Sequence, residues 1–216
     1  MCFFKKMKQK KYGFIPSKID GTEHIYFGNG VGSDKIPDTY SYKEFLPEIL
    51  DQGQDSICVP CSISTFLNWR ENLKNGSSND NHIDYFEIYD IREGKHDGMT
   101  FKDAFNYLRH HGVKSDIGVL KIQEYAMIQS FWALRTAILM NGPCVGALPV
   151  YNNRSDFWNK KPGDFLMGYH AIAIVGYNND GFLIRNSWGE DFGDEGYTEI
   201  PYEEFPKFIE IWTVIN

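Results

Sequence analysis

The sequence has no apolar run long enough to cross a membrane and no signal-peptide pattern at its start. A transmembrane helix needs about 20 consecutive, mostly apolar residues. The opening stretch, MCFFKKMKQKK, instead places a short apolar patch before its lysines, an order that does not match a secretory signal. We therefore expect a cytoplasmic protein with no membrane partner; association with a viral particle stays open.

Negative charges outnumber positive charges in this sequence. The 22 Lys and Arg residues are outnumbered by 29 Asp and Glu residues, which gives a formal net charge of −7. Because nucleic-acid binding requires a basic surface, nucleic acid is not an expected partner. Five lysines lie near the N-terminus, at positions 5, 6, 8, 10 and 11. We interpret them as a solvated tail, with a docking or address role as the alternative.

Cysteine is also rare, with four residues in the chain. Disulfides seldom persist in a reducing compartment, so Cys2 and Cys144 are expected to be free thiols, Cys144 in the core. Cys58 and Cys61 are three residues apart, which suits a redox couple, half of a metal site, or a nucleophile followed by a packing thiol. A zinc cage would need a second close Cys or His pair, and none is present. No metal or cofactor is predicted.

The order of the secondary-structure signals predicts an α+β protein with two lobes. Apolar residues at helical spacing predict helices over 58–75, 84–92, 100–111 and 130–141. Thr100 is expected to cap the third helix, with Asp103 at its third position, and Gly76 to end the first. Short β-rich runs follow at 143–151, 170–178, 181–189 and 196–201. Helices followed by strands are typical of α+β architecture.

Three residues far apart in the sequence suit nucleophilic catalysis. Cys58 stands where a polar loop meets the start of the first helix, and the helix N-terminus favours a thiolate. His170 begins one β-rich run and Asn186 ends the next, so a hairpin around 178–181 would bring them together. A thiolate, an imidazole and an amide that orients the imidazole are the parts that acyl transfer needs.

Four sequence blocks, DQGQDSIC, GYHAIAIVGY, LIRNSWG and FGDEGYTEIP, occur in the order found in papain-like cysteine proteases, which this sequence resembles. The resemblance implies that Cys58 is the nucleophile, His170 the general base and acid, and Asn186 the residue that holds the imidazole. It also implies that Gln52 donates a hydrogen bond to the oxyanion. Trp188 is similar to the tryptophan that shields the His–Asn bond from water.

The resemblance, which is greatest to bacterial and viral members without a long propeptide, covers roughly residues 11–206. It implies a papain-like two-lobe fold, with a helical N-terminal lobe, an antiparallel β-sheet or barrel in the C-terminal lobe, and the active-site cleft between them. The expected divisions are a mostly extended N-terminal arm over 1–40 and a peptidase domain over 41–216, with a helical lobe at about 50–135 and a β lobe at about 140–216. We expect the arm to pack along the outside of the domain, a lid over the cleft being the alternative.

The predicted function is that of a monomeric cysteine endopeptidase that cleaves protein or peptide substrates through a thioester acyl-enzyme. By resemblance, Gly98 lies along the substrate backbone and Ala147 lines the main side-chain pocket, with Trp188 nearby; turn and core roles for Gly98 and Ala147 are equally open. Two other functions stay open. One is a thiol–disulfide oxidoreductase that uses Cys58 and Cys61, and the other is a catalytically inactive binding or structural protein with the same fold.

Overall fold

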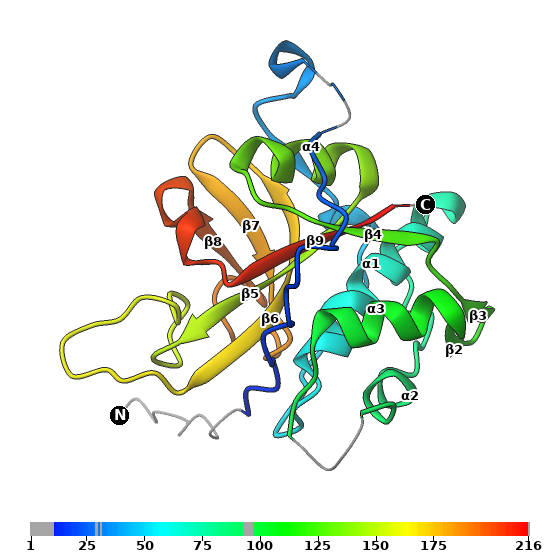
Figure 1. Ribbon diagram of the computed structural model, residues 1–216, viewed down its shortest axis with the longest axis horizontal. Helices are drawn as coiled ribbons and strands as arrows, with labels where there is room; N and C mark the ends of the chain where they lie inside the picture. The colour runs from blue at the N-terminus through cyan, green and yellow to red at the C-terminus, as the bar shows by residue number, and fades with distance from the viewer. Residues whose placement is uncertain (1–10, 29, 31, 93–96, 216) are drawn as a thin grey trace.

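The computed structural model describes residues 11–28, 30, 32–92 and 97–215. Cys2 and the lysines before Lys11 lie outside these residues, so the predictions made for them are not addressed. The described chain forms a helical half and a strand half that lie side by side (Figure 1). This arrangement confirms the predicted α+β, two-lobe fold. No helix in the described ranges is both long and apolar enough to cross a bilayer.

The helical half contains three helices and a small hairpin. Their bounds are α1 Cys58–Asn75, α2 Tyr85–Tyr89, α3 Phe101–His110, β2 Val113–Ser115 and β3 Gly118–Leu120. Two predicted caps are confirmed: the Thr100 hydroxyl accepts the Asp103 N–H, and Gly76 ends α1 in the left-handed region at φ 61°. The second helix is shorter than predicted. Arg92 donates to the Tyr89 carbonyl at 2.7 Å, which satisfies an acceptor that a longer helix would pair internally.

The strand half is an antiparallel sheet in the order β4-β9-β5-β6-β7-β8, with β1 paired to β6. The strands are β1 Tyr40–Ser41, β4 Glu124–Met127, β5 Cys144–Val150, β6 Gly168–Tyr177, β7 Gly181–Arg185, β8 Tyr197–Pro201 and β9 Glu210–Ile215. The four strands predicted from the sequence are therefore confirmed as β5 to β8. Sequence reasoning missed β4 and β9, which pair with each other.

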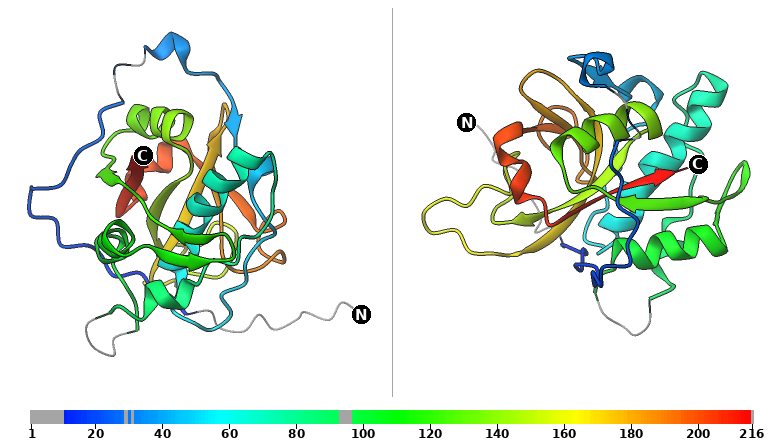
Figure 2. Two further views of the ribbon diagram at one scale, coloured as in Figure 1. Left: turned by 90° about the vertical axis from the view of Figure 1, so that its right-hand side faces the viewer. Right: turned by 45° about the horizontal axis from the view of Figure 1, so that its top comes forward.

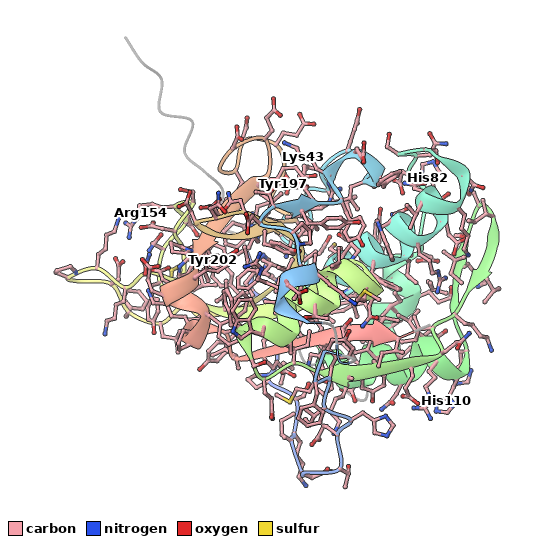
Figure 3. All side chains as sticks on the ribbon, turned by 90° about the horizontal axis from the view of Figure 1, so that it is seen from above. Lys43, His82, His110, Arg154, Tyr197 and Tyr202 are labelled. Carbon is pink, nitrogen blue, oxygen red and sulfur yellow. The ribbon has the colours of Figure 1, made fainter. Side chains whose placement is uncertain are left out.

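Short segments join and cover these elements. Three 3₁₀ helices, η1 Ser33–Lys35, η2 Lys43–Phe45 and η3 Tyr202–Lys207, lie in the connections. The Lys43 ammonium lies 4.4 Å from the ring centre of Tyr197, which ties η2 to β8 (Figure 3). The fourth predicted helix is present as α4 Phe131–Asn141, and it packs on the strand half, across β6 and β9 (Figures 1 and 2).

Helix α1 joins the two halves because it packs directly against β6. Its inner side chains, Ile63, Phe66 and Leu67, are buried, and each contributes about 1.5–3 kcal/mol by leaving water. In the C-terminal part of α1, Trp69 packs closely on Gly142. A Cβ on Gly142 would lie 2.1 Å from the Trp69 indole. These contacts hold the first residue of α1 against the strand half.

The N-terminal arm does not follow the predicted course. Figure 1 shows its dark blue part running between β6 and α3 before it crosses β4 toward α4. Phe14 forms a parallel bridge with Met99 beside α3, and Ile25 forms one with Met127 in β4. The expectation that the arm packs along the outside of the domain is therefore wrong for residues 11–15, which lie between the halves.

Candidate active site

Cys58 is the first residue of α1, and its side chain is fully buried. Burial raises the pKa of the Cys58 thiol to about 11 and outweighs the backbone N–H groups of Ala171 and Gly13, which lower it. Because Ala171 follows His170 in β6, the thiol lies against the strand that carries His170. A protonated, covered thiol at neutral pH is a poor nucleophile.

His170 and Asn186 are joined across the start of β6 and the end of β7. His170 Nε2 lies 2.7 Å from Asn186 Oδ1, and both side chains are buried. The backbone N–H of Ser187 also donates to Asn186 Oδ1 at 2.7 Å, which identifies that atom as the amide oxygen. Nε2 therefore donates to Asn186 Oδ1, and in the neutral imidazole this assignment leaves the lone pair on Nδ1. This is the tautomer that a general base needs toward a thiol.

Aromatic rings cover the His–Asn pair. The Trp188 indole lies on the His170 imidazole with ring centres 4.4 Å apart and a 29° interplanar angle. Phe157 packs against both of them, with centres 5.0 Å from Trp188 and 5.8 Å from His170. These rings exclude water, and a hydrogen bond in such a low-dielectric setting is stronger than one in water.

Gln52 reaches the same site from the loop before α1. Its Nε2 donates to the carbonyl of Asp55 at 2.8 Å and to that of Lys11 at 3.3 Å. Its Oε1 accepts from the Ser187 hydroxyl at 2.6 Å. The structure thus brings together Gln52, Cys58, His170 and Asn186, while the roles predicted for them stay predictions.

Ser187 is a site residue that sequence reasoning missed. Its N–H orients the Asn186 amide, and its hydroxyl orients the Gln52 amide. One residue therefore positions both the proposed imidazole orienter and the proposed oxyanion donor. The only hint in the sequence is that Ser187 follows Asn186 in the block LIRNSWG. Its role could not be inferred from that position, because its partner Gln52 is brought beside it only by folding.

Of the three predicted substrate-binding residues, Trp188 covers the His–Asn pair, and Gly98 and Ala147 lie in different halves of the molecule. Gly98 has a φ of 136°, and a Cβ built on it would lie 2.9 Å from the Gly13 carbonyl oxygen. Ala147 is fully buried in β5, in register with Ala171 and with Glu210 of β9. Gly98 is thus beside the arm and Ala147 is next to the His170 strand. A substrate-binding role for either one stays a prediction.

Two further thiols in the described part of the chain are buried and form no disulfide. Cys61 and Cys144 are free cysteines, as expected for Cys144, and burial raises both pKa values, that of Cys144 to about 12. Among the described residues, no group of three or more His, Cys, Asp or Glu side chains is arranged to hold a metal ion. His82 and His110 are exposed on the outer side of the helical half (Figure 3), so neither is a candidate for the general base.

Comparison with known sequences identifies the family. The family model described as "Papain family cysteine protease" matches residues 59–208. The chain belongs to the papain family of cysteine proteases. The match begins one residue after Cys58 and contains both His170 and Asn186, so it supports the resemblance on which the site was predicted.

Curated papain-family relatives align over part of the chain. The cathepsin B-like cysteine proteinase 1 of Haemonchus contortus is 40% identical over 86 residues, which cover 35% of this chain and 24% of the relative. A gut-specific cysteine proteinase of Caenorhabditis elegans is 30% identical over 110 residues, or 46% of this chain and 30% of the relative. The chain therefore spans about a quarter to a third of the length of these relatives.

Solved papain-family structures match the fold over nearly the whole chain. Xylellain, a cysteine protease from Xylella fastidiosa, superposes with a TM-score of 0.78 at 21% identity, covering 99% of this chain and 98% of xylellain. Procathepsin B S9 from Trypanosoma congolense superposes with a TM-score of 0.75 at 16% identity, covering 94% and 86%. At these identities the likeness concerns the fold, and it confirms the papain-like architecture.

Proposed function

We propose that the chain is a cysteine peptidase in which Cys58 is the nucleophile and His170 the general base and acid. The observation that carries the proposal is the 2.7 Å contact between His170 Nε2 and Asn186 Oδ1, beside a thiol at the first residue of α1. In this tautomer His170 can take the thiol proton on Nδ1, and the helix N-terminus stabilises the thiolate.

The reaction follows from these positions. The thiolate adds to a peptide carbonyl, and the resulting oxyanion accepts hydrogen bonds from Gln52 Nε2 and from the Cys58 N–H. The Cys58 N–H is available because the first N–H groups of a helix have no partner within the helix. The imidazolium of His170 then gives its proton to the leaving amine as the C–N bond breaks. Water, activated by the same imidazole, hydrolyses the thioester and restores the thiol. No cofactor takes part in this scheme.

Cleavage within a chain, rather than at its end, is supported by the course of the arm. Lys11 lies on the Gln52 side of Cys58, and Ile15 lies on the Met99 side. An extended peptide can therefore continue in both directions from the thiol, as an endopeptidase requires. We propose protein or peptide substrates on this basis. Monomeric state and cytoplasmic location stay predictions from the sequence.

The burial of Cys61 argues against the redox alternative. Redox-active cysteine pairs sit in partially exposed, electropositive surroundings that lower a thiol pKa. Cys61 is 3% exposed, and burial raises its pKa. It lies within α1, and its N–H donates to the Ile57 carbonyl at 3.0 Å, so it acts as a packing residue in this proposal.

The test compares two cysteine variants with the native chain. We expect Cys58→Ala and His170→Ala to lower peptide hydrolysis by at least about 1,000-fold, because each removes a group that acts in the transition state. Cys61→Ala is expected to keep most of the activity. An epoxide-type cysteine-protease inhibitor, followed by peptide mass mapping, should label Cys58.

Two results would decide for the alternatives. Equal loss in both cysteine variants, together with insulin reduction by the native chain, would establish the oxidoreductase. No hydrolysis of a peptide library by the folded native chain would indicate a catalytically inactive protein.

A further inference from the structure

Cys61 lies one helical turn from the proposed nucleophile but takes no part in the proposed reaction. Its N–H donates to the Ile57 carbonyl at 3.0 Å, so the first turn of α1 has regular helix geometry. Residues three apart in such a helix project from the same face, and their Cα atoms are about 5 Å apart. A disulfide spans Cα separations of about 4.4–6.8 Å. The helix therefore holds Cys58 and Cys61 within the range of a disulfide.

The position of Cys58 at the end of the helix allows the remaining adjustment. Cys58 is the first residue of α1, and the first N–H groups of a helix have no partner within it. Cys58 can therefore turn toward Cys61 without breaking a helix hydrogen bond made by its own N–H. Pro60, between the two cysteines, also lies in the first turn, where proline costs no hydrogen bond.

The two thiols face the same strand of the other half. The Ala171 N–H of β6 lies at the Cys58 thiol. Cys61 and Ala171 both line a cavity of about 10 Å³, together with Asn186. A cavity of that size admits about one water, so it has no room for a substrate or an external thiol. Cys61 thus lies on the catalytic side of α1, where Cys58 is the thiol within its reach.

The surroundings of the two thiols decide which of them ionises first. Burial raises the pKa of Cys58 to about 11, and the backbone N–H groups of Ala171 and Gly13 act in the opposite direction. Burial also raises the pKa of Cys61, and the negative charges of Cys58 and Asp55 raise it further. Because the thiolate is the form that reacts with hydroperoxides, oxidation begins at Cys58.

We propose that Cys61 is the resolving thiol of a reversible oxidation site, which stores an oxidised Cys58 as a Cys58–Cys61 disulfide. The oxidant is a hydroperoxide, and a dithiol reductant restores both thiols. The inference rests on the proposed function in calling Cys58 the nucleophile, but the formation of the disulfide is independent of it. The disulfide removes the nucleophile, so the oxidised chain is inactive and recoverable.

Two steps form the disulfide. The Cys58 thiolate attacks one peroxide oxygen, the O–O bond breaks as an S–O bond forms, and the leaving hydroxide takes up the thiol proton as water. This step oxidises the sulfur by two electrons and reduces the peroxide by two. The Cys61 sulfur then attacks the Cys58 sulfur, the S–S bond forms, and the hydroxyl leaves with the Cys61 proton as a second water. A sulfenic acid is uncharged, so the Cys58 charge that raises the pKa of Cys61 is absent in this second step.

This role differs from that of a thiol–disulfide oxidoreductase. An oxidoreductase needs an accessible thiol to meet its substrate, whereas a disulfide within one helical turn needs the neighbouring sulfur alone. Cys61 is 3% exposed, which suits the second role. Without a resolving thiol, a sulfenic acid proceeds to sulfinic and sulfonic acids, which dithiols do not reduce. Cys61 therefore protects Cys58 from irreversible oxidation.

The experiment compares the native chain with Cys61→Ala and with Cys144→Ala, which removes another buried free thiol, in β5. Each protein is treated with hydrogen peroxide at neutral pH, and the peptide that carries residues 58 and 61 is weighed before and after reduction by dithiothreitol. We expect the native chain and Cys144→Ala to form the Cys58–Cys61 disulfide and to regain both thiols. Cys61→Ala should instead accumulate sulfinic and sulfonic acid at Cys58, with at least about fivefold less thiol recovered.

Peptide hydrolysis, measured before oxidation, after it and after reduction, separates the inference from the proposed function. A reversible disulfide together with hydrolysis that is lost and then restored supports both. A reversible disulfide in a chain that hydrolyses no peptide supports the resolving role of Cys61 and refutes the peptidase.

Two results overturn the inference. One is sulfinic or sulfonic acid at Cys58 of the native chain, formed as fast as in Cys61→Ala. The other is a native chain in which peroxide produces no Cys58–Cys61 disulfide. The second result needs the native chain alone, so it decides the matter even if Cys61→Ala does not fold. Cys61→Ser, which nearly preserves the side-chain volume, then replaces that variant.

Discussion

Replacement of Phe14 by alanine should loosen the part of the arm at residues 11–15, which lies beside Cys58, without unfolding the protein. Phe14 is 4% exposed and packs on Phe101, so the change removes a buried aromatic side chain. Burial of such a side chain contributes about 1.5–3 kcal/mol from transfer alone, and truncation in a rigid core costs about 3–5 kcal/mol. Because Phe14 is the large buried side chain of residues 11–15, the loss falls mainly on the packing of this segment. A loss of about 2 kcal/mol corresponds to an opening constant roughly 30-fold larger.

The assay is the alkylation of Cys58 by iodoacetamide, followed by peptide mass mapping. Its rate measures how often residues 11–15 open. At low reagent concentration, where closing is faster than reaction, the rate is proportional to the open fraction. We expect Phe14→Ala to react roughly 30-fold faster than the native chain. Ile19→Ala is the control, because Ile19 lies in the same arm and is 45% exposed, and it should react at the native rate.

The result that would refute this reasoning is a lowered unfolding midpoint with no change in Cys58 alkylation. Phe14 would then stabilise the whole fold, with Phe101 and α3, rather than the packing of residues 11–15 beside Cys58. An equal acceleration in Ile19→Ala would also count against the reasoning, because it would mean that any change in the arm loosens it.

Two further predictions concern the core and the thiol. Gly142→Ala should lower the unfolding free energy in urea by about 1–3 kcal/mol, because its Cβ would meet the Trp69 ring at 2.1 Å and its φ is 104°; an unchanged midpoint would contradict this. Burial raises the pKa of Cys58 to about 11, so its protonated form is the one that the closed fold favours. The protonated Cys58 thiol therefore stabilises the fold fully below about pH 8.5, the pKa of a cysteine in the unfolded chain. This stabilisation is lost as the pH rises toward 11. Cys58 alkylation in the native chain should accordingly keep rising above pH 9. In Gly13→Ala, whose Cβ would lie 2.0 Å from the Ser56 carbonyl oxygen, it should level off at lower pH. Superimposable profiles would show that residues 11–15 do not cause the burial of the thiol.

Local signals in the sequence were sufficient for much of the fold. Thr100 with Asp103 marks the start of α3, and Gly76 marks the end of α1, because capping depends on residues within one turn of the chain. Strands β5 to β8 were also recognisable, since each carries enough β-branched and apolar residues to identify it without its neighbours. The family resemblance, carried by the blocks around Cys58, His170 and Asn186, supplied the arrangement of the two lobes.

Long-range pairing was beyond these signals. Strand β4 is four residues long and forms by pairing with β9 at the other end of the chain, for example Ala126 with Thr213. So short a strand has no periodicity of its own, because its stability comes from the partner. The double hydrogen bonding of Ser187 was hidden for the same reason: Gln52 is 135 residues away.

The sequence by itself determined the residue types of the site and the elements that carry them. A thiol at a helix start, and a histidine and an asparagine on successive strands, follow from local pattern and from the family blocks. Only the tertiary structure decided where the arm lies. Residues 11–17 have no periodicity that indicates a partner. Their position depends on backbone groups of Met99 and Tyr169 and on the close approach of Gly13 to Ser56, where a Cβ would lie 2.0 Å from the carbonyl oxygen. Backbone groups are the same in every residue, so the complementarity that places the arm over Cys58 exists only once both halves have folded around it.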